Sequence, residues 1–167
     1  MLMREILRGQ NPTSDAVVTA LDRWLGNHDE LHTIAVFSAL PGEVDVSPLA
    51  NLRPDLRWVY PKVANELLTF HEIHDAAIEL VPGAFGIPEP AQECPEIRIE
   101  EIDAFICPGL AFDRHGGRLG RGRGFYDRML AQARAGTVKI GVCFEFQRVP
   151  ETYAEDHDIR MDRVFSD

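Results

Sequence analysis

The chain has 167 residues, 45% of them hydrophobic and 26% charged, and this composition excludes an intrinsically disordered protein. That length corresponds to about one domain and is sufficient to bury a core without disulfide or metal crosslinks. The formal net charge of −10 disfavours nucleic acid as a partner, because an acidic surface repels the phosphate backbone. We therefore expect a single domain over residues 1–167.

The three cysteines are Cys94, Cys107 and Cys143, widely spaced and without a CxxC pair. This pattern argues against a disulfide framework and against a cysteine zinc site, and it predicts thiols buried in the core. No apolar stretch approaches the roughly 20 residues of a membrane span, and residues 1–10 lack the apolar region of a secretory signal. We expect a cytoplasmic protein that does not contact a membrane.

The first predicted element is a helix from Ser14 to Leu25. Val17, Leu21 and Leu25 recur at the spacing of one helical face, Ser14 is a suitable N-cap, and Gly26 favours termination.

Short apolar runs between turn-forming residues predict the strands. They cover residues 32–38, 57–60, 66–71, 102–107, 138–144 and 163–165. A stretch rich in proline, glycine and acidic residues, 81–96, is expected to be an ordered loop, and a further helix is predicted over 126–135. Strands that alternate with helices predict a three-layer α/β/α sandwich with a mainly parallel sheet. In such sheets ligands bind beyond the carboxyl ends of the strands.

The segment between Phe112 and Arg128 is the strongest candidate for chemistry. Residues 113–128 contain five arginines and two aspartates, so this segment has a charge of +3 in a chain of −10. Five glycines lie within nine residues, 116–124, and glycine-rich backbone places free N–H groups around an anion. Arginine forks match phosphate oxygens, and Asp127 is a carboxylate of the kind that holds magnesium beside phosphates. The pattern predicts a site for ATP-type phosphates; the alternative is a solvated surface loop. No lysine lies inside it, so it is not a P-loop.

This segment resembles the signature of the 5-formyltetrahydrofolate cyclo-ligases, also called methenyltetrahydrofolate synthetases. The matching positions are Pro108, Gly109, Ala111, Phe112, Asp113, Gly117, Arg118, Leu119, Gly120, Gly122, Gly124, Phe125, Tyr126, Asp127 and Arg128. Weaker features follow the family order. These are Glu43 to Asp45, Tyr60 to Lys62, Leu68 to Phe70, Phe85 to Pro90, Gly141 with Phe144 and Gln147, and His157, Asp158 and Asp162. The resemblance covers the chain from about Ser14 onwards.

The resemblance implies ATP- and Mg²⁺-dependent cyclisation of 5-formyltetrahydrofolate to 5,10-methenyltetrahydrofolate through a phosphorylated formyl group, with release of ADP and phosphate. The catalytic residues expected on this basis are Arg118, Tyr126 and Asp127. The expected ATP contacts are Gly117, Arg118, Leu119, Gly120, Arg121, Gly122, Arg123, Gly124, Phe125 and Tyr126. Contacts with the reduced folate are expected from Glu43, Phe70, Phe85 and Tyr126, and magnesium ligands from Asp127 and Asp158. The expected assembly is a monomer or weak homodimer.

Several of these roles have plainer alternatives. Phe70, like Trp58, is an aromatic residue on a predicted strand and is more typical of a core than of a pocket. Asp158 is also placed to pair with Arg160 or Arg163 at the surface.

The sequence also departs from the family pattern. Family members carry a lysine and an arginine on a longer first helix, whereas this chain offers only Arg4 and Arg8 before Ser14. We hypothesise that Arg121 and Arg123 replace that positive charge. Two other functions stay open: a paralogue that acts on another small molecule, and a non-catalytic nucleotide- or folate-binding protein.

Overall fold

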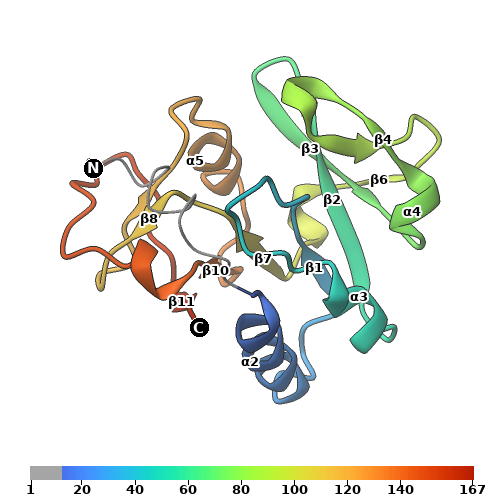
Figure 1. Ribbon diagram of the computed structural model, residues 1–167. Coiled ribbons are helices and arrows are strands. Elements are labelled where there is room, and N and C mark those ends of the chain that lie inside the picture. Colours follow the sequence, from blue (N-terminus) through green and yellow to red (C-terminus); the bar gives the residue numbers. More distant parts are fainter. Residues whose placement is uncertain (1–12) are drawn as a thin grey trace.

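The structure, a computed structural model, describes residues 13–167, and in it a seven-stranded sheet lies between helices on its two faces (Figure 1). The strand order is β11-β10-β7-β1-β2-β3-β6. These strands are β1 (Thr33–Ala35), β2 (Arg57–Ala64), β3 (Leu67–Glu72), β6 (Glu96–Ile97), β7 (Ala104–Cys107), β10 (Val138–Val142) and β11 (Arg163–Phe165). The five from β11 to β2 are mutually parallel, and β3 runs antiparallel to β2 and to β6. The prediction of a mainly parallel sheet is confirmed.

Two small antiparallel sheets and four helices complete the fold of residues 13–167. The small sheets pair β4 (Leu80–Pro82) with β5 (Pro88–Pro90), and β8 (Ala111–Phe112) with β9 (Arg118–Leu119). The helices are α2 (Asp15–Gly26), α3 (Pro48–Leu52), α4 (Ala76–Glu79) and α5 (Phe125–Leu130). Single 3-10 turns lie at η1 (Ala84–Gly86), η2 (Ile99–Glu101) and η3 (Glu145–Gln147). Among the helices of residues 13–167, none is long and apolar enough to cross a membrane.

The central strands are apolar on both faces because both faces are covered. In β7, Ala104 and Ile106 join the core cluster that contains α2 and α3, whereas Phe105 and Cys107 join the cluster that contains α5. All four side chains are fully buried, which explains the uninterrupted apolar run in the sequence. Figure 1 shows α2 and α5 on opposite sides of the sheet. The expected three layers are therefore present.

The first helix agrees with its prediction, but its N-cap differs in detail. Ser14 is the N-cap residue, yet its side chain makes no capping hydrogen bond. Its Oγ instead accepts a hydrogen bond from the N–H of Asp45 at 2.8 Å. The start of α2 is thus attached to the loop that follows β1.

The structure differs from prediction most clearly after Leu130. The helix predicted over 126–135 ends at Leu130, and the next N–H groups bond three residues back in turns, Gln132 to Met129 and Ala133 to Leu130. The guanidinium of Arg134 donates to the carbonyls of Glu100 and Ile102 and pairs with Asp103 at 2.6 Å. These contacts attach the turn after α5 to the start of β7.

The segment 81–96, predicted as an ordered loop, contains regular secondary structure. It contains most of the β4–β5 hairpin and η1, because Val81 pairs with Glu89 across the hairpin. Strand β1 is shorter than predicted, since the chain leaves the sheet after Ala35.

Candidate functional site

A cavity of about 550 Å³ lies beyond the carboxyl ends of β1 and β7, where an α/β sheet places its ligands. The loop after β1 supplies Glu43 to its lining, and the loop after β7 supplies Pro108 and Gly109. Pro61 and Val63, in the second half of β2, contribute apolar surface. The sheet topology therefore brings segments far apart in sequence to one hollow.

Most of the predicted site residues line this cavity. They are Glu43, Phe85, Arg118, Leu119, Gly120, Arg121, Gly122, Arg123, Gly124, Phe125, Tyr126, Asp127 and Asp158. Phe70 is not among them. It is 2% exposed and packs edge-on against Phe105, with ring centroids 5.5 Å apart, inside the core. Gly117 also lies outside the lining, in the turn between β8 and β9. Trp58 is likewise a core residue and donates its indole N–H to the carbonyl of Arg53 at 2.9 Å.

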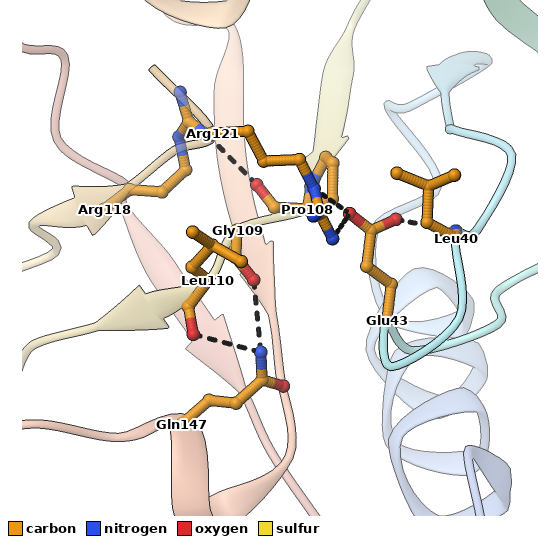
Figure 2. A network of polar contacts seen from close by, with 8 residues as sticks. All are labelled: Leu40, Glu43, Pro108, Gly109, Leu110, Arg118, Arg121 and Gln147. Atoms are coloured by element: carbon orange, nitrogen blue, oxygen red, sulfur yellow. Dashed lines mark hydrogen bonds and ion pairs between the residues drawn. The ribbon is translucent and has the colours of Figure 1, made fainter. Parts of the chain in front are cut away.

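Arg118 is a nearly buried cation beside the cavity. Its side chain is 6% exposed, and Nη1 donates to the carbonyl oxygen of Pro108 at 3.2 Å (Figure 2). Nη2 lies 3.8 Å from Oδ1 of Asp127, and the guanidinium carbon lies 5.3 Å from the ring centroid of Tyr126. Its Nε is buried and has no acceptor among the described residues. A buried donor without a partner is unfavourable, so a ligand oxygen at this position would be stabilised.

Backbone donors extend from Arg118 into the following loop. Within the described chain, the N–H groups from Gly120 to Gly124 donate to no protein acceptor. Gly122 has φ +96° and Gly124 has φ +70°, conformations that glycine adopts at little cost. Consecutive free N–H groups in such backbone form a concave site for anions. Because α5 spans only Phe125–Leu130, its dipole adds little to this site.

Glu43 and Arg121 form an ion pair between two loops of the cavity. Nε and Nη2 of Arg121 donate to Oε1 of Glu43 at 3.2 and 3.1 Å, and the N–H of Leu40 donates to Oε2 at 2.9 Å. Figure 2 shows this pair next to Pro108 and Arg118. The Glu43 side chain is only 7% exposed, so both of its oxygens are engaged within the protein. Glu43, a predicted contact of the folate, and Arg121, a predicted contact of ATP, therefore bind each other in this structure.

The remaining arginine of the loop packs on an aromatic ring. The guanidinium of Arg123 lies 3.8 Å from the ring centroid of Phe85, a cation–π contact. Phe85 is 53% exposed and has φ +58°, a conformation rare for a bulky side chain. Strained backbone of this kind is concentrated at binding sites. Phe85 thus presents a half-exposed aromatic ring at the cavity, with Arg123 over one face.

Asp127 and Asp158 line the same cavity with similar exposure, 28% and 26% of their side chains. Asp127 accepts a hydrogen bond from the N–H of Ile159 at 3.3 Å. Asp158 accepts one from the N–H of Glu155 at 2.8 Å, and the basic side chain beside it in residues 13–167 is that of His157, with Nε2 at 3.5 Å from Oδ1, not Arg160 or Arg163. Nowhere in that range do three or more metal-binding side chains cluster. Two carboxylates fit Mg²⁺, which normally completes its shell with phosphate oxygens and water.

Asp113 is a buried carboxylate that holds two segments of this site together, a role that the sequence did not predict. Asp113 is 1% exposed; Oδ1 accepts from the N–H groups of His115 and Gly117, and Oδ2 accepts from the N–H and hydroxyl of Thr152. Burial raises the pKa of Asp113, but these hydrogen bonds outweigh it and hold the pKa at about 2. The carboxylate joins the turn before Arg118 to the segment that leads to Asp158. An aspartate shortly before two glycines is a turn signal, but nothing in the sequence points to Thr152.

Two other groups beside the cavity are neutral at physiological pH. Burial raises the pKa of Tyr126 well above its ordinary value of 10, and burial raises the pKa of Cys107 to about 12. Cys107 is a free, fully buried thiol, as predicted from its apolar surroundings. Neither group supplies an anionic nucleophile.

The fold and cavity define an α/β protein in which a loop of glycines and arginines faces an apolar wall. The sequence model of the 5-formyltetrahydrofolate cyclo-ligase family matches residues 27–167, and the chain belongs to this family. It is 36% identical to the 5-formyltetrahydrofolate cyclo-ligase of Escherichia coli K12 over 141 residues, which cover 80% of this chain and 76% of the relative. The corresponding protein of Mycolicibacterium smegmatis is 43% identical over 88 residues, 52% of this chain and 45% of the relative.

Two solved structures are similar to this one. The 5,10-methenyltetrahydrofolate synthetase of Aquifex aeolicus superposes with a TM-score of 0.79 at 32% identity, covering 92% of this chain and 77% of that one. The synthetase of Mycoplasma pneumoniae superposes with a TM-score of 0.78 at 24% identity, covering 97% and 94%, and supports the fold. The resemblance found in the sequence is thus confirmed.

Proposed function

We propose that this protein converts 5-formyltetrahydrofolate to 5,10-methenyltetrahydrofolate with ATP and Mg²⁺. Family membership supports the reaction class. The observation that carries the ATP dependence is the anion site at one end of the cavity: the unpaired Nε of Arg118 next to the free N–H groups from Gly120 to Gly124.

The reaction balances in two steps. The terminal phosphoryl group moves from ATP to the formyl oxygen, which breaks its bond to the bridging oxygen and releases ADP. The second folate nitrogen then attacks the activated formyl carbon, the bond from that carbon to the phosphorylated oxygen breaks, and inorganic phosphate leaves. The attacking nitrogen loses its proton to solvent, and the product is a cationic five-membered ring.

In this proposal the protein stabilises charge and fixes geometry. Arg118 and the N–H groups after Leu119 hold the phosphate oxygens, so that charge developing during transfer meets donors already in place. Asp127 and Asp158 would hold Mg²⁺. The ion, when bound, neutralises phosphate charge during transfer. The Tyr126 hydroxyl stays protonated, because burial raises its pKa, and is therefore a hydrogen-bond donor.

The apolar wall is the proposed folate side of the cavity. Phe85 offers an exposed ring, and Pro61, Val63 and Leu68 line the same region. A flat ring system held between such groups is shielded from water, which favours attack by the second nitrogen over hydrolysis of the activated group.

The test is the absorbance of the methenyl-folate band in a mixture of purified protein, 5-formyltetrahydrofolate, Mg²⁺ and ATP. We expect a rise that requires ATP and is lost in Asp127→Ala. ATP consumption without any methenyl band would indicate a paralogue with another substrate. Binding of ATP or folate without turnover of either would indicate a non-catalytic binding protein.

A further inference from the structure

Glu89 is a buried carboxylate inside the cavity. It lies in the middle of β5, is 7% exposed, and belongs to the cavity lining. In the described part of the chain it has no ion-pair partner. A buried charge without a counterion is unfavourable, so its retention calls for a compensating contact.

The two oxygens of Glu89 differ in their contacts. Oε1 accepts hydrogen bonds from the N–H groups of Val63 at 3.3 Å and Ala84 at 3.2 Å. Oε2 accepts none from the described residues and retains contact with solvent, and the side chain to which it belongs lines the cavity. Glu43 differs in this respect, because Arg121 and Leu40 engage both of its oxygens.

The contacts of Oε1 do not by themselves require a carboxylate. They join β5 and η1 to β2, and one neutral amide oxygen would accept both N–H groups equally well. A glutamine would hold the hairpin without burying a charge. The free anionic oxygen is therefore the feature that a structural role leaves unexplained.

We propose that Glu89 recognises the pterin ring of the folate through its 2-amino group and the adjacent ring N–H. This inference rests on the proposed function. An ionised carboxylate only accepts hydrogen bonds, and this edge of the pterin presents two neighbouring N–H donors. The surrounding residues suit the flat faces of the ring, since Val63 and Ile87 are apolar and Phe85 is aromatic. The formyl group then extends from this end of the cavity toward the anion site.

The decisive variant is Glu89→Gln, which preserves size and the acceptor for Val63 and Ala84 but replaces the free oxygen with a donor. We expect it to melt close to the wild-type temperature and to bind 5-formyltetrahydrofolate about 10- to 100-fold more weakly in calorimetry without ATP, as for loss of a charge-assisted hydrogen bond. The Michaelis constant for ATP should change little. Glu43→Gln tests the competing cavity carboxylate, and Glu96→Gln on β6 is the surface control.

A folate analogue that carries a methyl group in place of the 2-amino group gives a second readout. It should bind wild type about as weakly as 5-formyltetrahydrofolate binds Glu89→Gln, and the substitution should not weaken it further. This comparison on wild type alone also tests the proposal if Glu89→Gln fails to fold, because equal affinity for the two folates would overturn it.

These experiments distinguish failure of the proposed function from failure of the role proposed for Glu89. If wild type neither binds 5-formyltetrahydrofolate nor forms the methenyl product, the proposed function fails and the role of Glu89 with it. If wild type does both and Glu89→Gln binds the folate equally well, Glu89 is structural and only this inference fails. Loss of binding in Glu43→Gln but not in Glu89→Gln would assign pterin recognition to Glu43.

Discussion

Replacing Asp113 with asparagine tests whether this carboxylate holds two segments of the site together. The substitution keeps the shape of the side chain and an oxygen for the N–H groups of His115 and Gly117. It places an amide NH₂ against the N–H of Thr152, where two donors meet. Asp113→Asn should therefore detach the segment that carries Asp158 from the turn that precedes Arg118.

The lowered pKa of Asp113 sets the expected loss of folding stability. A fall from the ordinary 3.8 to about 2 corresponds to about 2 kcal/mol of stability at neutral pH, since each unit is worth about 1.4 kcal/mol. Because the folded-state pKa is the lower one, this contribution is fully present above pH 4 and is lost as the pH falls toward 2. At pH 3 about half of it remains.

Urea denaturation at pH 7 and pH 3 measures this effect. We expect Asp113→Asn to lower the free energy of unfolding by about 2 kcal/mol at pH 7, which is roughly 4–8 °C in melting temperature for a chain of this size. The difference from wild type should shrink by about 1 kcal/mol at pH 3. Equal differences at the two pH values would refute the claim that a hydrogen-bonded, ionised carboxylate braces the site.

Two further predictions concern the phosphate end of the cavity. Reversal of both loop charges, Arg121→Glu with Arg123→Glu, should raise the Michaelis constant for ATP at least about tenfold. Arg98→Glu, outside the cavity, is the charge control, and an unchanged constant would show that these arginines do not replace the family's N-terminal cations. Asp158→Asn should raise the Mg²⁺ concentration for half-maximal activity about tenfold while leaving folate binding without ATP unaltered. An unaltered Mg²⁺ requirement would remove Asp158 from the metal site.

The sequence predicted the layers and the sheet because strong local patterns encode them. The buried run of β7 and the face of α2 defined by Val17, Leu21 and Leu25 each specify one element, and the structure contains both. The predicted end of α5 was wrong, because the chain after Leu130 forms turns, and Arg134 there binds carbonyls on another segment, a long-range contact that helical composition does not reveal.

The site was predictable where its residues are contiguous. The loop from Arg118 to Asp127 could be found as one motif, and the structure places all of it along one cavity. Phe70 was a predicted folate contact, but its position on a strand does not reveal that its side chain lies in the core. The hydrogen bond between Thr152 and Asp113, 39 residues apart in the sequence, forms only on folding and leaves no local sequence signal. The roles of Arg4 and Arg8 lie outside the described residues.

The central claim is that one phosphoryl transfer from ATP drives each ring closure at this cavity. The most direct test measures ADP and methenyltetrahydrofolate in the same reaction, with wild type and Arg118→Met compared. We predict one ADP for each methenyl ring formed, and loss of both products together in the variant. Methenyl formation without ADP, or ADP release that does not depend on 5-formyltetrahydrofolate, would contradict the account.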